Sequence, residues 1–227
     1  MANRDVVLCS PVRTAIGTYG GTLKDTPAVD LGAVVVRAAL ERAKLPPGEV
    51  DTVVMGNVVQ AGNKMNPARQ AAIHGGVPVD VPAMTVNRVC GSGAQAIASA
   101  AQEVMLGFID SAVAGGMENM DRAPYLMNSG RWGYRMGDGQ IFDAMLMDGL
   151  NDAFSSQHSG WHTEDLARSH QITREEQDRW AERSQKRFSA AQAAGKFAAE
   201  IAAVEIAARK GLTKFDKDEH NPAGHHT

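Results

Sequence analysis

The sequence predicts an α/β fold with a mostly parallel sheet, and two observations lead to this prediction. Over the first 120 residues, short runs of β-branched residues alternate with longer alanine-rich stretches whose apolar residues have helical spacing. Proline and glycine mark several of the joins between the two kinds of segment. Such alternation is typical of strand–helix–strand units, in which successive strands run parallel.

The first elements are expected between residues 6 and 58. A strand is predicted at Val6–Ser10, and Cys9 within it would be core packing. A helix is predicted at Asp30–Lys44, because its first residue is a good N-cap, its apolar positions form one face, and Pro46-Pro47 follow it. The next strand is predicted at Val50–Val58.

The second half of this region predicts two further helices and two further strands. A helix at Asn66–Ile73 has proline at its first helical position and two glycines after it. A strand at Ala83–Val89 leads into a helix at Ser92–Gly107, and Ser111–Ala114 is the last strand. His74 would lie at a helix C-terminus, where positive charge is favourable and no chemistry is required.

After Met120 the sequence becomes rich in methionine, glycine and arginine and poor in β-branched residues, which indicates a second region. Its one long regular stretch is a helix predicted at Thr173–Ala194, where Thr173 and Glu176 can form a capping box. Sparse apolar positions predict that this helix lies on the surface with one buried stripe. The expected divisions are a domain over 1–120, a second over 121–220 and a disordered tail over 221–227.

Cys90 is the most informative residue, because it ends an apolar run and the small residues Gly91-Ser92-Gly93 then open a helix. The free N–H groups and the positive dipole end of a helix start favour a thiolate over a thiol. Gly91 and Gly93 would allow a tight turn and close approach of a bulky thioester. An inert, buried cysteine is the alternative, and the position alone leaves both open.

The segment 87–120, NRVCGSGAQAIASAAQEVMLGFIDSAVAGGMENM, closely resembles the nucleophile region of the thiolases. The resemblance runs from Val6 to about Glu219 and includes VRTAIGTYGGTLKD, GNVVQAGNKMNPARQAA, MGDGQIFDAMLMDGL and ITREEQDRWAERSQ in the family's order. It implies a layered αβα fold with a mostly parallel sheet and an inserted loop domain. It also implies that Cys90 accepts an acyl group from acyl-CoA as a thioester.

Thiolases are usually close to twice as long as this chain, so the resemblance implies that the C-terminal half is absent. In the family that half supplies a histidine, an asparagine and a second cysteine to the reaction. It also packs against the first half, and the helix at Ser92–Gly107 is too apolar to face water alone. The expected partners are therefore a C-terminal thiolase half or further copies of the chain in a dimer or tetramer.

The resemblance places four further residues in the substrate site. Leu150 and His158 would line the pantetheine and acyl-binding walls, and Ser159 stands where the family usually has methionine. Arg209 would meet the adenine and phosphate end of CoA, a task that suits a guanidinium. A loop histidine bonded to backbone is the alternative for His158, and a solvated basic turn is the alternative for Arg209.

The activity implied is reversible condensation of acetyl-CoA to acetoacetyl-CoA, or thiolytic cleavage of a 3-ketoacyl-CoA. A non-catalytic CoA-binding or assembly module is the alternative. We expect no cofactor besides the CoA thioester substrates and no metal. His220, His225 and His226 have metal-binding side chains, but their spacing fits no tight zinc motif, which favours a polar tail.

Composition sets the remaining expectations. A net charge of -3 and a sequence pI of about 6.2 give no reason to expect nucleic acid or an anionic membrane as partner. The apolar stretches are far shorter than the roughly 18 residues that a spanning helix needs. The chain has two cysteines and opens without the pattern of an export signal, so we expect a cytoplasmic protein with reduced thiols.

Overall fold

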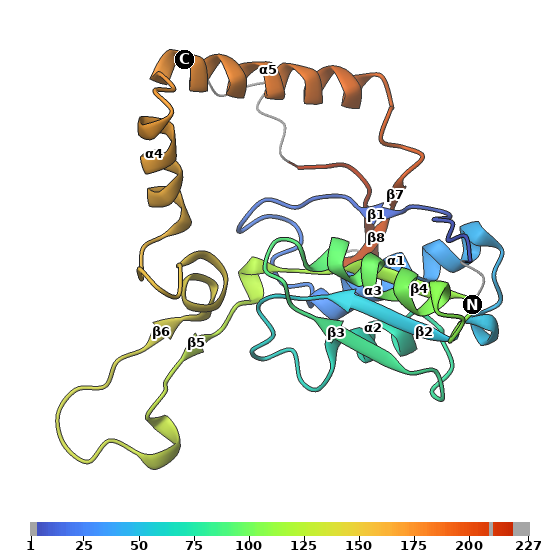
Figure 1. Cartoon of the computed structure of the whole chain (residues 1–227). Helices are drawn as coiled ribbons and strands as arrows, with labels where there is room; N and C mark the ends of the chain where they lie inside the picture. Colours follow the sequence, from blue (N-terminus) through green and yellow to red (C-terminus); the bar gives the residue numbers. More distant parts are fainter. Residues whose placement is uncertain (1–3, 209–210, 220–227) are drawn as a thin grey trace.

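The structure, a computed structural model, describes residues 4–208 and 211–219. Its centre is a three-stranded parallel sheet in the order β3-β2-β4, in which Val53 pairs with both Ala83 and Val113. Helices α1 and α2 cover one face of this sheet and α3 covers the other (Figure 1). The strands are β2 (Thr52–Gly56), β3 (Ala83–Val86) and β4 (Ala112–Gly116), and the helices are α1 (Ala28–Ala43), α2 (Pro67–His74) and α3 (Ser92–Met105).

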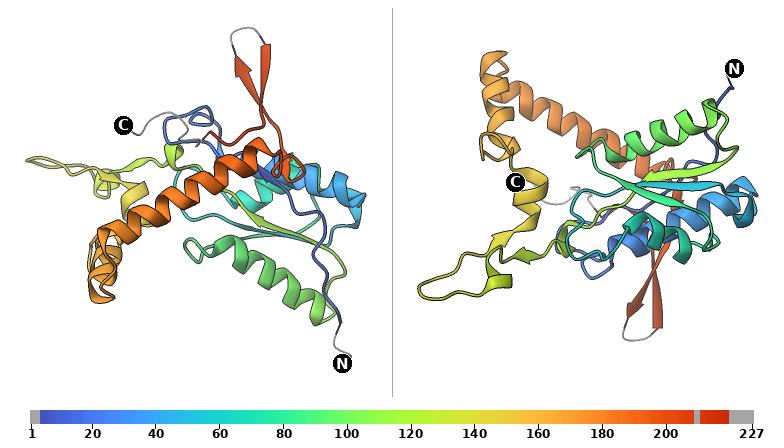
Figure 2. Two further views of the ribbon diagram at one scale, coloured as in Figure 1. Left: turned by 90° about the horizontal axis from the view of Figure 1, so that it is seen from above. Right: turned by 60° about the horizontal axis from the view of Figure 1, so that its bottom comes forward.

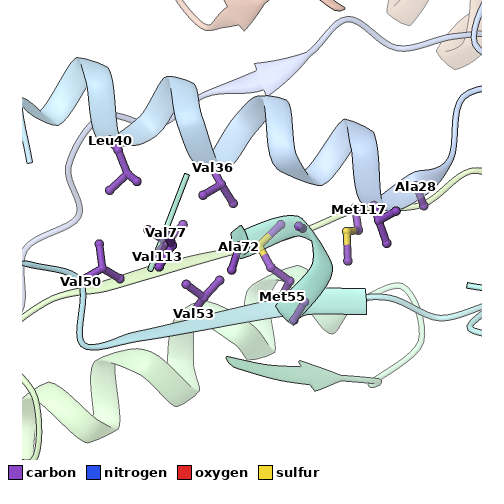
Figure 3. Close-up of a cluster of buried hydrophobic side chains, with 13 residues drawn as sticks. Ala28, Val36, Leu40, Val50, Val53, Met55, Ala72, Val77, Val113 and Met117 are labelled. Atoms are coloured by element: carbon purple, nitrogen blue, oxygen red, sulfur yellow. The ribbon is translucent and has the colours of Figure 1, made fainter. Parts of the chain in front are cut away.

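The three layers follow from the alternating side chains of β2, the central strand, which is buried along its whole length. Val53 and Met55 point into the cluster formed with α1 and α2 (Figure 3). Val54, between them, packs against Ala96 and Ala100 of α3. Because side chains alternate along a strand, one strand supplies the core on both faces. This arrangement confirms the predicted layered α/β fold.

Most predicted elements of the first region are found, with small changes at their ends. The Asn66 side chain caps α2 by accepting a hydrogen bond from the Arg69 N–H at 3.2 Å. Helix α1 begins two residues earlier than predicted, with Pro27 as its N-cap in place of Asp30. Asp30 instead lies in the first turn, where its charge still complements the helix dipole.

The predicted strand at Val6–Ser10 is wrong, and so is core packing of Cys9. Residues 6–10 form no strand, Cys9 is exposed, and Val7 and Leu8 are 77% and 76% exposed. An isolated strand is not stable, because its backbone groups need a neighbouring strand and its side chains need a surface to cover. Among the described residues this segment has no such partner.

The remaining elements are short, apart from two helices and one hairpin. Strand β1 pairs in parallel with β7, whereas β5 pairs with β6 and β8 pairs with β9 in antiparallel fashion. Their bounds are β1 (Arg13–Thr14), η1 (Pro47–Glu49), η2 (Met120–Arg122), β5 (Tyr125–Leu126), η3 (Gly130–Trp132), β6 (Phe142–Asp143), η4 (Met145–Leu150), α4 (Ser159–Ser169), α5 (Arg174–Ala193), β7 (Ile201–Ala202), β8 (Val204–Ala208) and β9 (Gly211–Phe215).

Helices α4 and α5 form an arm that extends away from the layered core (Figures 1 and 2). The predicted capping box at Thr173 and Glu176 is present, and α5 ends one residue before the predicted end. The predicted buried stripe is wrong, because no residue of α5 is buried and Trp180 is 66% exposed. The spacing of the apolar residues would allow a buried stripe, but no other segment of the described chain packs against most of the helix.

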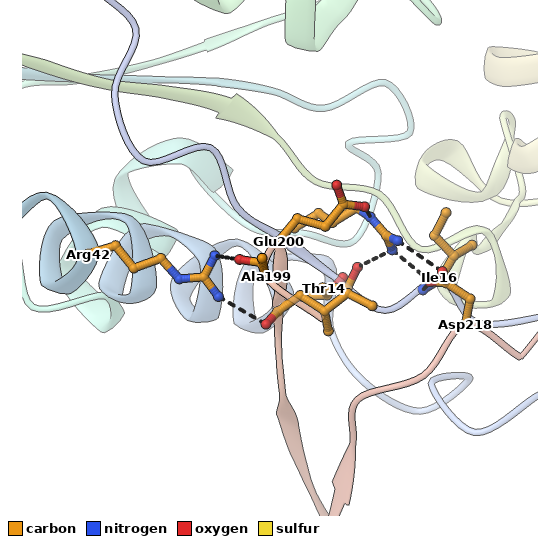
Figure 4. A network of polar contacts seen from close by, with 8 residues as sticks. Thr14, Ile16, Arg42, Ala199, Glu200 and Asp218 are labelled. Atoms are coloured by element: carbon orange, nitrogen blue, oxygen red, sulfur yellow. Dashed lines mark hydrogen bonds and ion pairs between the residues drawn. The ribbon is translucent and has the colours of Figure 1, made fainter. Parts of the chain in front are cut away.

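The segment after the arm returns to the core through a charged cluster around Arg13 (Figure 4). The Arg13 guanidinium donates to both carboxylate oxygens of Asp218, at 2.7 and 2.9 Å, and to Glu200 at 2.7 Å. Asp218 also accepts a hydrogen bond from the Ile16 N–H at 2.8 Å, and its side chain is only 4% exposed. These contacts join positions about two hundred residues apart in the sequence.

Two neighbouring contacts reinforce this return. Glu219 accepts hydrogen bonds from the backbone N–H groups of Thr18, at 2.9 Å, and Thr22, at 3.0 Å. Arg42 of α1 donates to the carbonyl oxygens of Ala199 and Ile201. The end of the described chain is thus tied to the loop that precedes α1 and to α1 itself.

None of the helices within the described ranges has the length and apolar character needed to cross a membrane.

We predict that Asp218→Asn destabilises the chain by about 3 kcal/mol at neutral pH, because it leaves a half-buried guanidinium short of its main partner. Arg13 lowers the pKa of Asp218 in the folded chain. The stabilisation is therefore present above the ordinary aspartate pKa and is lost as the pH falls through the lowered one. Urea unfolding of the two chains across the acid range should show the difference shrinking.

Asp165→Asn is the matched control, since its pair with Arg168 leaves both side chains more than two-thirds exposed. We expect this variant to unfold within about 0.5 kcal/mol of the parent chain. A stability difference for Asp218→Asn that stays constant from neutral to strongly acid pH would contradict the assignment.

Candidate active site

A cavity of about 390 Å³ opens where strands β2 and β4 end and helix α3 begins. Ligands of open α/β sheets bind at this carboxyl edge of the strands. The lining comes from the ends of both strands, from the turn before α3, and from the segment at η4. The lining residues are Gly56, Asn57, Val58, Val59, Val89, Cys90, Ser92, Gly93, Gly116, Met117, Glu118, Met120, Gly149 and Leu150.

Cys90 lies in a tight turn that side-chain hydrogen bonds hold in place. Val89, just before it, has a φ of 50°, a left-handed conformation that is unfavourable for a β-branched residue. The Val89 N–H donates to Asn87 Oδ1 at 2.9 Å, and the Val89 carbonyl accepts from Ser92 Oγ at 2.6 Å. Ser92 Oγ also accepts from the Arg88 N–H at 2.8 Å. Strain of this kind, of order 1–3 kcal/mol, concentrates at functional sites.

Glycines allow the start of α3 to lie directly on the strand ends. A Cβ atom on Gly56 would lie 2.6 Å from the Ser92 carbonyl carbon and 2.8 Å from the Gly93 nitrogen. A Cβ atom on Gly116 would lie 3.4 Å from both Gly56 O and Gly93 Cα. The first of these approaches excludes any side chain at Gly56, because the atoms it would meet are backbone.

The Cys90 side chain is exposed and lines the cavity, so the burial assumed in the alternative interpretation is wrong. No side chain caps the N-terminus of α3, whose N-cap is Gly91. The Ser92 N–H donates to the Val89 carbonyl at 3.0 Å, and Ser92 and Gly93 line the cavity. The N-terminus of α3 therefore borders the cavity, where the positive end of a helix dipole favours negative charge.

The lining of the cavity contains a polar pair that the sequence analysis missed, the buried Asn57 and the half-buried Glu118. Asn57 is 1% exposed, and its Nδ2 donates to the Met117 carbonyl at 3.2 Å and to Glu118 Oε1 at 2.9 Å. The Val58 N–H donates to Glu118 Oε2 at 2.7 Å. Burial is the main cause that raises the pKa of Glu118, and hydrogen bonds from Val58, Val59 and Asn57 oppose it. The sequence feature that could have indicated this pair is that Asn57 and Glu118 closely follow strands that are parallel neighbours.

The structure brings only some of the predicted site residues together. Leu150, at the end of the wide helical turn η4, lines the cavity with Cys90. His158 and Ser159 are not among its lining residues. His158 Nδ1 instead accepts the Gly160 N–H at 3.0 Å and caps α4, which begins at Ser159. Arg209 lies outside the described residues, as do His220, His225 and His226.

Within residues 4–208 and 211–219, no group of three or more histidine, cysteine, aspartate or glutamate side chains is placed to hold a metal ion.

Comparison with known proteins shows which family has this combination of fold and site. The family described as "Thiolase, N-terminal domain" matches residues 6–226. The acetyl-CoA acetyltransferase of Cupriavidus necator is 51% identical over 216 residues, which cover 95% of this chain and 55% of that protein. The acetyl-CoA acetyltransferase of Escherichia coli is 49% identical over 217 residues, with the same two coverages.

A solved structure gives the same result. The crystal structure of the Bacillus anthracis acetyl-CoA acetyltransferase superposes with a TM-score of 0.90 and 39% identity, covering 95% of this chain and 55% of that one. The chain therefore belongs to the thiolase family, and it matches the family's N-terminal domain. It spans about half the length of the relatives that it matches.

We predict that Gly56→Ala destabilises the chain by about 1–3 kcal/mol, because the new methyl group must displace the start of α3. The displacement should also change the rate at which iodoacetamide alkylates Cys90. Thermal unfolding and mass-spectrometric alkylation rates test both effects.

Gly48→Ala is the matched control, since a Cβ atom at Gly48 meets nothing within 4 Å. We expect its stability and its alkylation rate to match those of the parent chain. Equal behaviour of the two variants would show that the backbone approach at Gly56 does not hold the turn.

Proposed function

We propose that this chain is the nucleophile-bearing part of a thiolase-type acyltransferase, in which Cys90 takes an acyl group from acyl-CoA. The observation that carries the proposal is the exposed Cys90 thiol in a cavity at the start of α3. Membership of the thiolase family and the names of the relatives, acetyl-CoA acetyltransferases, support it. The cavity volume lies within the range of small-molecule sites.

The first half-reaction takes place at this turn. The Cys90 thiolate attacks the thioester carbonyl carbon, and the bond between that carbon and the CoA sulfur breaks. The proton that Cys90 gave up is returned to the departing CoA sulfur, which leaves an S-acyl cysteine and free CoA. We expect the Cys90 N–H to stabilise the negative oxygen of the intermediate, a contribution of roughly 3 kcal/mol for one donor.

The second half-reaction transfers the acyl group onward, either to a carbanion formed from a second acetyl-CoA or to CoA. Transfer to the carbanion gives acetoacetyl-CoA. In the cleavage direction, Cys90 instead forms the S-acyl cysteine by attacking the 3-keto carbon of the 3-ketoacyl-CoA, the bond between C2 and C3 breaks, and the carbanion takes a proton and leaves as acetyl-CoA. Transfer of the acyl group from Cys90 to CoA then completes the cleavage. We assign the groups that activate Cys90 and move the α-proton to the part of the relatives that this chain does not span. The thioester supplies the activation, so we expect no metal or redox cofactor.

The substrate contacts are assigned on the family resemblance and on position. Leu150 faces the acyl and pantetheine part of the substrate in the cavity. His158 and Ser159 are proposed to contact the substrate beyond the cavity lining, and an isolated bridge between Asn151 and His158 holds His158 beside the segment that ends in Leu150. Arg209 is proposed to contact the phosphate and adenine end of CoA. Residues 121–220 together are proposed to form the substrate-covering domain.

We propose that the missing part of a thiolase covers the outer face of α3. This face has apolar residues at helical spacing that the described chain leaves open, and Ile97 and Met105 are 37% and 42% exposed. The five residues of the face, of which Ala101 is partly buried, are Ala94, Ile97, Ala98, Ala101 and Met105. The matched relatives are nearly twice as long as this chain, which supplies an occupant of suitable size.

Transfer of radiolabel from [1-¹⁴C]acetyl-CoA to the chain tests the activity. We expect label on the parent chain that is lost in Cys90→Ser, because the hydroxyl is a far weaker nucleophile at neutral pH. Cys9→Ser is the matched control and should keep the label, since Cys9 is exposed but lies outside the cavity. Saturable CoA binding without label would favour the alternative of a CoA-binding module.

Addition of the C-terminal part of the Cupriavidus necator acetyl-CoA acetyltransferase tests the partner. We expect a one-to-one complex in analytical ultracentrifugation, which Ile97→Asp weakens at least tenfold by placing a charge on the apolar face. Gln102→Asp, at an exposed polar position on the same helix, should leave the complex unchanged. Equal weakening by both substitutions, or a folded chain that stays monomeric and binds no such partner, would contradict this assignment.

A further inference from the structure

Glu118 is the only carboxylate that lines the Cys90 cavity in the described part of the chain, and the half-reaction above gives it no task. It lies two residues beyond β4, and Asn57 directly follows β2. Because β2 and β4 are parallel neighbours, these two side chains meet at the carboxyl edge of the sheet. Their contact is therefore fixed by strand pairing and not by a flexible loop.

Both oxygens of Glu118 are used as acceptors. Oε1 receives Asn57 Nδ2 at 2.9 Å and Oε2 receives the Val58 N–H at 2.7 Å. Both oxygens of Asn57 also have partners, because its Oδ1 accepts from Asn63 Nδ2 at 3.2 Å and its carbonyl accepts from Gln60 Nε2 at 3.0 Å. The carboxylate thus ties the chain after β4 to the loop after β2.

The loop held in this way forms one wall of the cavity and supports another. Val58 and Val59 are lining residues, and Val59 is only 3% exposed. A Cβ atom on Gly149 would lie 3.5 Å from Val59 Cγ2, so η4 lies beside this wall. Leu150, next in the chain, then faces the same cavity as Cys90. A shift of the wall would therefore move the surface that faces the acyl group.

We propose that Glu118 is a positioning residue of the acyl-transfer site, whose carboxylate fixes the wall formed by Val58 and Val59 and through it the place of Leu150 opposite Cys90. The inference rests on the proposed function, since it names what the wall positions. Glu118 does not need to touch the reacting atoms. Its effect is on the limiting rate of acyl transfer, because misplacement by about 1 Å costs on the order of a hundredfold in rate.

Glu118→Gln tests the proposal, since the amide keeps the shape but turns one acceptor into a donor that faces another donor. We expect the limiting rate of Cys90 acetylation to fall at least tenfold, with less than a threefold change in the half-saturating acetyl-CoA concentration. Amide exchange of Val58 should accelerate at least tenfold. Asp121→Asn is the matched control, because it removes one exposed carboxylate three residues away and outside the cavity.

Glu118→Asp is the second variant and covers the case in which Glu118→Gln does not fold. It keeps the charge but withdraws both oxygens by one methylene, and we expect the same two effects. Unchanged Val58 exchange in the folded variant overturns the inference, whatever the acetylation rate. A limiting rate within twofold of the parent chain also overturns it. A parent chain that is not acetylated at all refutes the proposed function instead, and the exchange experiment then decides the role of Glu118 by itself.

Discussion

The close backbone approach between the start of α3 and the ends of β2 and β4 is the constraint on which the rest of the site depends. It brings the first helical N–H groups to the carboxyl edge of the sheet, beside the turn that presents Cys90. A side chain at Gly56 would push the helix away, since it would meet Ser92 and Gly93 at less than 3 Å. This contact between two segments of main chain therefore positions the nucleophile relative to the sheet.

The turn at Cys90 is strained, and the surrounding structure holds it in place. Val89 holds a left-handed conformation that its branched side chain disfavours, and Asn87 and Ser92 hold it there through three hydrogen bonds. A strained turn keeps its shape only when its surroundings determine it more strongly than the local backbone does. The result is an exposed thiol on a rigid support, which suits a nucleophile that must meet a substrate in one orientation.

The second region is attached to the core both near the cavity and at its far end. Near the cavity, η4 lies beside Val59. At the far end the attachment is apolar and ionic together, since Val204 and Phe215 are buried in one cluster with Leu23 and Leu31, and Arg13 binds Asp218 and Glu200. Between these places α4 and α5 have no buried residue, so their exposed aromatic side chains, among them Trp161 and Trp180, remain available to other surfaces.

The sequence by itself determined the order of the main helices and strands from α1 to β4, the caps at Asn66 and Thr173, and the turn at Cys90, because these depend on neighbours a few residues apart. Only the tertiary structure decided that residues 6–10 form no strand, that α5 has no buried stripe, and that Asn57 and Glu118 meet under the cavity. Each of these outcomes depends on whether a distant segment supplies a backbone partner, an apolar surface or a donor. The periodicity of one stretch of sequence does not reveal which distant segment will pack against it.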